Sequence, residues 1–191
     1  MRYSADHKQQ TQVRLLESSA RLIKKEGVGS VGVDGLMKAI GLSGGAFYSH
    51  FPSKSDLFSA VVERELTQSF ERLSGGQSLS HAQLDKCLKQ YLSLAHVENV
   101  EAGCALPALG AEIARADEAV RKQAEHWICQ LHASWARTLG CEQLAWAVLS
   151  QCVGALVIAR MMVSVQARSE VLQASYAALS QQVAETKGGQ A

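Results

Sequence analysis

Apolar residues recur at spacings of three and four along most of the chain, which is the period of an amphipathic helix. No stretch alternates apolar and polar residues in the way that indicates a β-strand. Proline occurs only at Pro52 and Pro107, so long segments are free to be helical. The pattern therefore predicts an all-α protein.

The same spacing, combined with caps and glycine breaks, predicts about nine helices. The first is closed by Gly27, and its inward face is expected to hold Val13, Leu16, Ala20 and Ile23. Two short helices follow, one from Val33 to Ile40 and one from Gly44 to about His50. Ser53 caps a longer helix that ends near Leu73, and Ser80 caps one that continues through Ala95. The last four are a short helix after Gly103, one between Asp117 and Gly140, one from Cys141 to Gln166, and one patterned by Val171 to Val183.

Two of the short helices form a helix-turn-helix. The helices at 33–40 and 44–50 are joined by the tight turn Gly41-Leu42-Ser43, which is typical of that motif. The second helix is small enough to lie in a DNA major groove about 12 Å wide. We expect phosphate contacts from Ser43, Tyr48, His50 and Lys54, and base contacts at Gly44, Ala46 and Ser49.

The segment 40–57, IGLSGGAFYSHFPSKSDL, resembles the signature of the TetR family of repressors. The resemblance implies a three-helix DNA-binding domain at 1–54 and a helical bundle for ligand binding and dimerisation at 55–191. It also implies a homodimeric, sequence-specific repressor that a small-molecule inducer releases from a palindromic double-stranded DNA operator. The chain departs from the pattern at Gly44, where family members often carry a basic side chain.

Charge and cysteine usage narrow the setting. The net charge is +1, but residues 1–54 hold eight Lys and Arg against four acids, which favours a polyanionic partner for that segment. The five cysteines form no CxxC pair and no signal peptide opens the chain, so we expect a cytoplasmic protein. Polar residues interrupt the apolar stretch 144–165, which predicts a buried helix and no membrane partner.

Two other functions remain open. Gly27–Gly32 matches GxGxxG, which would suit an enzyme with a nicotinamide cofactor if a strand preceded it. A helix is expected there instead, so we interpret the glycines as a helix end and loop. An architectural DNA-binding protein without an inducer would share the basic segment. The chain has no HExxH or GxSxG motif, so the sequence predicts no catalytic residues, metal or cofactor.

Aromatic and thiol side chains supply candidates for the inducer pocket. Tyr91, Trp127 and Trp135 carry polar tips on apolar bodies, which is typical of pocket linings. The segment 103–112 resembles a "GC" segment in one branch of TetR-like regulators, which includes repressors of detoxifying oxidoreductases, some with reactive cysteines. Cys104 also precedes a helix, whose unpaired N–H groups stabilise a thiolate. The hypothesis is that Cys104 lies at the pocket and that an electrophile or oxidant is the inducer.

The helix from Cys141 to Gln166 is apolar on nearly all sides, which predicts a dimer interface. We expect one apolar stripe to face the protomer's own core and a second to face the other copy. The two stripes are Val148, Cys152, Ala155 and Ala159, and Leu149, Val153, Leu156 and Met162.

Overall fold

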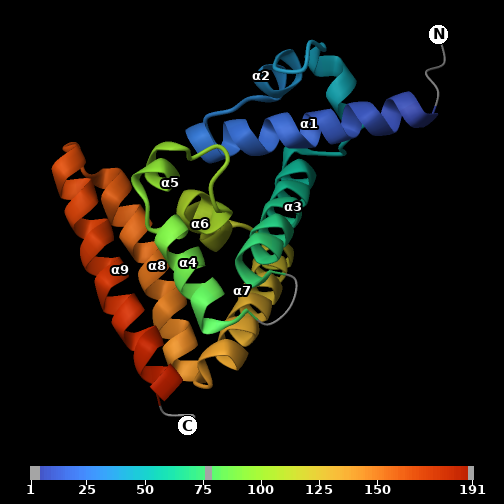
Figure 1. The fold of residues 1–191 in the computed structure, drawn as a ribbon. Helices are drawn as coiled ribbons and strands as arrows, with labels where there is room; N and C mark the ends of the chain where they lie inside the picture. Colours follow the sequence, from blue (N-terminus) through green and yellow to red (C-terminus); the bar gives the residue numbers. More distant parts are fainter. Residues whose placement is uncertain (1–4, 76–78, 189–191) are drawn as a thin grey trace.

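The computed structural model describes residues 5–75 and 79–188, and over those residues the chain is helical with no strand (Figure 1). The prediction of an all-α fold is confirmed. The elements are α1 (Ala5–Glu26), α2 (Val33–Lys38), the 3-10 helix η1 (Gly44–Ser49), α3 (Lys54–Ser74), α4 (His81–Tyr91), α5 (Leu94–Glu98), α6 (Ala105–Arg115), α7 (Glu118–Leu139), α8 (Glu142–Met161) and α9 (Val165–Gly188).

Most helix ends lie where the capping residues predict them. The Ser53 hydroxyl accepts a hydrogen bond from the Asp56 backbone N–H at 3.1 Å, and Asp117 accepts one from Val120 at 3.0 Å. Gly27 and Gly140 end α1 and α7 with φ values of 82° and 67°, a region that glycine enters without a Cβ penalty.

Two predicted helices are wrong in extent. The helix through Ala95 divides, because Leu92 leaves the helical region and the Ser93 hydroxyl caps α5 instead. The helix from Cys141 to Gln166 ends at Met161, and α9 begins at Val165. The apolar run continues through this second break without glycine or proline, so the sequence carries no stop signal there.

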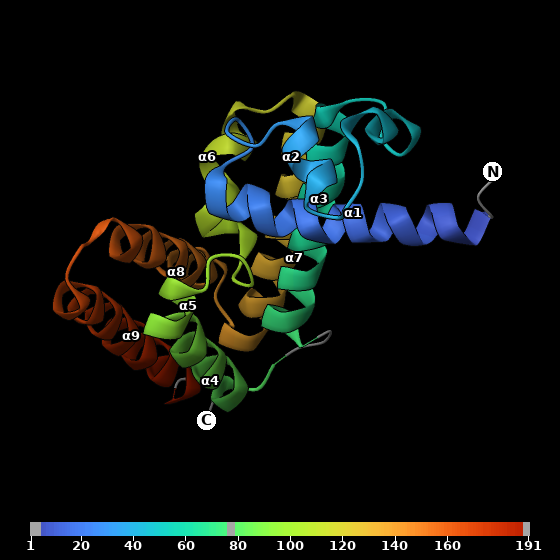
Figure 2. The same cartoon turned by 90° about the horizontal axis from the view of Figure 1, so that it is seen from above.

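The side chains form two apolar cores. The N-terminal core lies between α1, α2, η1, the first half of α3, α6 and the start of α7. The C-terminal core lies between α4, α5, the end of α7, α8 and α9. In Figures 1 and 2, α1 lies across one end of the molecule, and α8 and α9 run side by side at its flank. Because α7 contributes to both cores, it joins the two ends of the fold.

The inward face of α1 differs from the expectation at two positions. Ala20 and Ile23 are buried as expected, but Leu16 is half-buried and Val13 is 50% exposed, and Leu15 is the residue that is completely buried instead. Val13 lies on the N-terminal half of α1, which projects past the other helices (Figure 2). Thr11 and Leu15 are buried on either side of it in the sequence, so Val13 is exposed because it lies on the opposite side of α1 from the core.

Candidate functional site

The helix-turn-helix is held from beneath by apolar side chains. Phe47 on η1 is completely buried, Phe51 is nearly so, and their ring centroids are 6.2 Å apart. They share the N-terminal core with Leu36 and Met37 of α2. The side chain of Arg14 on α1 also donates a hydrogen bond to the Ile40 carbonyl at 3.3 Å. The orientation of η1 is therefore fixed by α1 and α2.

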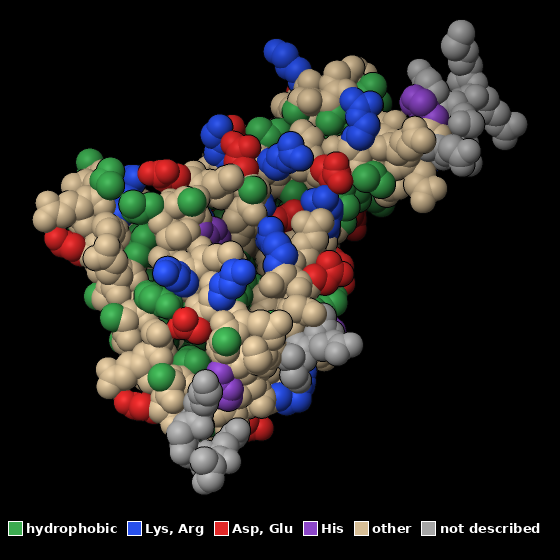
Figure 3. All heavy atoms as spheres, in the orientation of Figure 1, with side chains coloured by type: hydrophobic (Ala, Val, Ile, Leu, Met, Phe, Trp, Pro, Cys, Tyr) green, Lys and Arg blue, Asp and Glu red, His purple; other side chains and the backbone are tan. Residues whose placement is uncertain are grey.

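The residues expected to contact phosphate lie along the outer edge of this motif. Ser43 and Tyr48 are exposed, and Tyr48 is 66% exposed. Lys54 is half-buried in the first turn of α3, and His50 is half-buried at the end of η1. Burial, followed by the charges of Lys8 and His7, lowers the pKa of His50, so it is a neutral group at pH 7. On the face drawn in Figure 3, Lys and Arg side chains stand over α1 and α2.

The residues expected to contact bases lie on η1 itself. Ser49 is exposed, and its hydroxyl donates to the Ala46 carbonyl at 2.7 Å. Ala46 and Gly44 are half-buried. A Cβ at Gly44 would collide with the Asp34 carboxylate of α2. A side chain at this position would therefore require the exposed Asp34 carboxylate to move.

A cavity of about 210 Å³ lies between α3, α4, α5 and the loop before α6. Two of the predicted ligand residues, Tyr91 and Cys104, line it. The Ser69 hydroxyl also lines it, is buried, and has no hydrogen-bond partner among the described residues. The remaining lining residues are Arg72, Leu73, Cys87, Gln90, His96, Ala102 and Gly103.

Cys104 lies at the N-cap of α6, and only 4% of the residue is exposed. Its backbone N–H donates to His96 Nε2 at 3.0 Å, and His96 Nδ1 lies 2.8 Å from the Tyr91 carbonyl. His96 must therefore be neutral, with its proton on Nδ1, and burial lowers its pKa in keeping with that state. Burial and the Cys104 thiol, to which the Tyr91 hydroxyl is hydrogen-bonded, raise the pKa of Tyr91.

The other thiols differ from Cys104 in their surroundings. Cys87 lines the same cavity, and burial raises its pKa to about 11, so it is protonated at pH 7. Burial raises the pKa of Cys152 further. Cys129 is exposed on α7, and Cys141 is half-buried before α8. A thiol reagent has access to Cys129, so experiments on Cys104 need a control variant in which Cys129 is replaced.

The two predicted tryptophans lie outside this cavity. Trp135 is buried, and its Nε1 donates to the Leu73 carbonyl at 3.0 Å. Trp127 is half-buried, with its ring 5.6 Å from that of Phe70. Both side chains pack between helices, which is the ordinary place for large aromatic residues.

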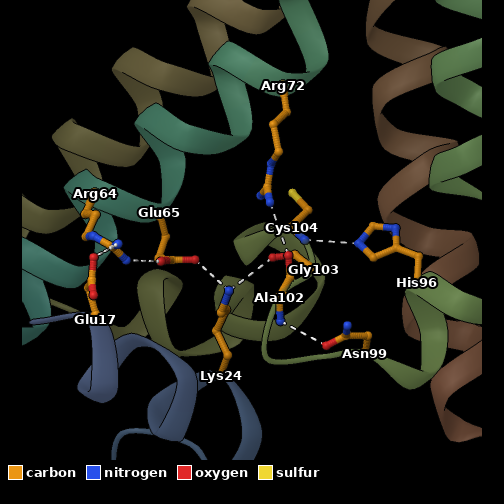
Figure 4. Close-up of polar contacts among 10 residues, drawn as sticks. All are labelled: Glu17, Lys24, Arg64, Glu65, Arg72, His96, Asn99, Ala102, Gly103 and Cys104. Carbon is orange, nitrogen blue, oxygen red and sulfur yellow. Dashed lines mark hydrogen bonds and ion pairs between the residues drawn. The ribbon is translucent and has the colours of Figure 1, made fainter. Parts of the chain in front are cut away.

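An ion pair that the sequence gives no sign of lies beside the cavity (Figure 4). Lys24 of α1 lies 2.6 Å from the Glu65 carboxylate of α3, and both side chains are at most 4% exposed. Lys24 also donates to the Gly103 carbonyl at 3.2 Å. Glu65 is joined by Arg64 at 3.0 Å. Charged residues are almost never this buried unless they are paired, and a helical period alone cannot identify such a pair.

Sites of other kinds find little support. The glycines at 27–32 follow α1 and precede α2, so the strand that a dinucleotide site requires does not stand before them. Over the part of the chain that the structure describes, no three His, Cys, Asp or Glu side chains are grouped to hold a metal ion.

The surface of α8 is apolar on the side that faces away from the protomer. Both stripes expected from the sequence are largely buried in the protomer, since Val148, Cys152, Leu149 and Leu156 belong to the C-terminal core. The expectation that one of those stripes faces a partner is wrong. The outward apolar side chains are instead Trp146, Val157, Ile158 and Met161. By length and composition α8 would also suit a membrane span, but it packs against α7 and α9 and contributes to the core.

Comparison with known proteins finds similarity centred on the helix-turn-helix. The family model "Bacterial regulatory proteins, tetR family" matches residues 15–61. Over 55 residues, the chain is 42% identical to the HTH-type transcriptional regulator AcrR of Shigella flexneri, covering 29% of this chain and 26% of that protein. Over 54 residues, it is 44% identical to the nucleoid occlusion factor SlmA of Haemophilus ducreyi, covering 28% and 27%. The matched segment spans about a quarter of the length of these relatives.

Solved structures resemble nearly the whole chain. The reduced form of Escherichia coli NemR has a TM-score of 0.73 at 20% identity, covering 90% of this chain and 97% of that one. A TetR transcriptional regulator from Chloroflexus aurantiacus has a TM-score of 0.78 at 19% identity, covering 94% and 96%. A regulator from Saccharomonospora viridis, solved with choline, has a TM-score of 0.71 at 16% identity, covering 87% and 94%. At these identities the likeness establishes the fold.

Proposed function

The chain belongs to the TetR family of bacterial regulatory proteins, and on that premise we propose that it is a transcriptional repressor that a small molecule releases from DNA. The observation that carries the proposal is the helix-turn-helix itself. Its anchoring side chains are buried, and its outer edge presents hydroxyl groups and a lysine to solvent. That combination suits a rigid element that enters a groove.

The DNA contacts divide into two kinds. Ser43, Tyr48, His50 and Lys54 would hold phosphates, because their polar atoms lie along the edge of the motif and Lys54 begins a helix whose N-terminus favours anions. Gly44, Ala46 and Ser49 would face base edges, since they lie on η1. Because Gly44 has no side chain, sequence preference at that position would come from close approach of the backbone to the DNA.

The functional unit would be a two-fold dimer on a palindromic operator. The outward face of α8 exposes Val157, Ile158 and Met161 to solvent. Trp146 is 41% exposed on the same face, and its ring stacks on that of His132 of α7 with centroids 4.0 Å apart. An exposed apolar face of this kind suits a protein–protein interface. A two-fold dimer would place two recognition helices on half-sites that are a helical turn or more apart.

The cavity beside Cys104 is our candidate inducer site. A buried hydroxyl without a partner, such as that of Ser69, is costly unless something else hydrogen-bonds to it. A ligand oxygen or nitrogen atom would fill that role. The volume of about 210 Å³ is below the usual range for drug-sized ligands, so the inducer would be small. The structure of the relative that holds choline indicates that this fold accepts small molecules of such size.

The inducer would react with the Cys104 thiol. With a Michael acceptor, a C–S bond forms at the sulfur, the alkene π bond breaks, and the thiol proton ends on the neighbouring carbon. Two features favour this cysteine: it lies at the start of α6, and no capping hydrogen bond engages its sulfur.

Selection of bound sequences from a random duplex pool tests the regulatory proposal. An enriched symmetric motif is expected, and a pool without one would refute operator binding. The thiol proposal is then tested by treating wild type, Cys104→Ser and the matched control Cys129→Ser with N-ethylmaleimide. Wild type and Cys129→Ser should release the selected duplex, and Cys104→Ser should retain it. Equal release by all three proteins would exclude Cys104 as the reactive group.

A further inference from the structure

The loop that carries Cys104 is fastened at four successive residues to three different helices. Figure 4 shows the contacts of Ala102, Gly103 and Cys104. Glu101 pairs with Lys25 of α1 at 3.1 Å. The Ala102 carbonyl accepts from Arg72 of α3 at 3.1 Å. The Gly103 carbonyl accepts from Lys24 of α1, and the Cys104 N–H donates to His96 of α5. A shift of this loop therefore has to be felt in α1, α3 or α5.

Among these contacts, the bond from Lys24 to Gly103 is the one buried link to α1. The Lys24 side chain is 3% exposed, whereas the Lys25 and Glu101 side chains are 61% and 44% exposed. An ammonium group in a dry site depends on every acceptor it has, because water cannot replace a lost one. Its acceptors are Glu65 and the Gly103 carbonyl. Moving the Gly103 carbonyl removes one of these two acceptors and leaves the Lys24 ammonium group with Glu65 alone.

The C-terminal end of α1, where Lys24 lies, is continuous with the support of the recognition helix. Ile23 is completely buried in the N-terminal core together with Phe47 of η1. Farther along α1, Arg14 donates to the Ile40 carbonyl in the turn region between α2 and η1. A tilt of α1 at Lys24 would therefore carry η1 with it.

We propose that the Lys24–Gly103 hydrogen bond, backed by Glu65, is the mechanical connection through which the cavity controls DNA binding. This proposal rests on the proposed function and adds its route. A ligand or adduct at Cys104 favours a conformation in which the Gly103 carbonyl has moved. That conformation leaves Lys24 underpaired, so α1 shifts and the two recognition helices of a dimer no longer match the operator.

Gly103 offers a way to move the loop without any ligand. A Cβ at this position would lie 2.8 Å from Cδ2 and Nε2 of His96 and 3.1 Å from the Asn99 carbonyl, so the loop or the ring must shift. The test is a double-mutant cycle of Gly103→Ala with Lys24→Met, a change that keeps the length of the side chain and removes its charge. Lys25→Met is the matched control, because Lys25 is the neighbouring lysine and also pairs with the loop. Operator affinity is measured for every combination.

We expect Gly103→Ala to weaken operator binding about tenfold in the wild-type background and in the Lys25→Met background. In the Lys24→Met background it should have little effect. Equal losses in all three backgrounds, or no loss in wild type, would overturn the proposal. If Lys24→Met fails to fold because Glu65 is stranded, Lys24→Met/Glu65→Leu replaces it, since apolar replacement of a buried ion pair is often tolerated. Hydrogen exchange over residues 33–50 gives a readout without DNA, and Gly103→Ala should raise it only where Lys24 is present.

The two proposals fail separately. The double-mutant cycle could show that the effect of Gly103→Ala depends on Lys24 while N-ethylmaleimide has no effect. That result would reject the thiol inducer and keep the connection through Lys24. Release by N-ethylmaleimide with an additive cycle would do the reverse. If no operator is found, the exchange measurement alone decides whether Lys24 links the loop to the helix-turn-helix.

Discussion

Substituting Ile158 by glutamate should separate the proposed dimer into folded monomers. The Ile158 side chain is 43% exposed in the protomer, so an interface over α8 would bury roughly that share of it. Full burial of such a side chain stabilises by about 1.5–3 kcal/mol, so the lost apolar contribution is about 1 kcal/mol in each copy. Two carboxylates that must leave water add about 2 kcal/mol each, a value reduced because they reach partly toward solvent. A total near 6 kcal/mol weakens dimerisation about 10⁴-fold.

Light scattering coupled to size-exclusion chromatography at micromolar concentration is the assay. Val13→Glu is the matched control, because Val13 is 50% exposed but lies on α1, far from α8 (Figure 1). Leu156→Glu is a contrasting variant: Leu156 is completely buried within the protomer, so this change should unfold the chain. A wild type that is monomeric, or an Ile158→Glu variant that stays dimeric with an unchanged urea midpoint, would refute the interface.

Three further predictions concern the other sites. Tyr48→Ala and Lys54→Ala should weaken binding to every duplex, and only Lys54→Ala should reduce the slope of log affinity against log salt concentration by about one unit. Ser49→Ala should instead change the preferred base. Unaltered affinities in filter binding would count against these contacts. Burial lowers the pKa of His96, so the unfolded chain binds more protons at this residue than the folded chain does. The contribution of His96 to the free energy of unfolding is therefore present above about pH 6.5 and is lost as the pH falls. In urea titrations at about pH 7.5 and 5.5, His96→Gln should reduce this loss. Ser69→Ala should leave the free energy of unfolding unchanged or raise it by up to about 1 kcal/mol, and a fall would mean that the hydroxyl has a partner in the empty protein.

The helix-turn-helix was predictable from sequence because its signals are local. Gly41 sits in the turn, Phe47 and Phe51 are four residues apart, and Ser53 caps the next helix, so each feature is set by near neighbours in the chain. The outward apolar surface of α8, the proposed dimer interface, was predictable only in part. The apolar composition of the helix indicates that it is buried on most sides. Which side faces the protomer's own core depends on how α7 and α9 pack against it. Most of the stripe chosen from the sequence is therefore buried in the protomer, and the helix ends at Met161, before the predicted Gln166.

The cavity beside Cys104, our candidate inducer site, was harder to predict from sequence because it depends on contacts between distant segments. Lys24, Glu65 and Gly103 are separated by about forty residues at each step, and each would pass as a surface charge or a flexible glycine when taken alone. Tyr91 and Trp135 look alike in sequence, yet only Tyr91 lines the cavity, because the indole N–H of Trp135 is engaged by the Leu73 carbonyl. Helical spacing assigns both side chains to an inner face without deciding what that face surrounds.

The structure also separates the roles of the two residues in the Gly103-Cys104 pair. Gly103 is required by space, since any Cβ would meet the His96 ring, and this requirement holds whether or not the protein senses thiol reagents. Cys104 has no such requirement. Its sulfur makes no capping hydrogen bond, and the N-cap position would accept a serine or an aspartate more favourably. The thiol on the wall of this cavity is the group that the proposed inducer would modify. The comparison of Cys104→Ser with wild type is therefore also a test of stability: the serine variant should fold as well as wild type and fail only in its response.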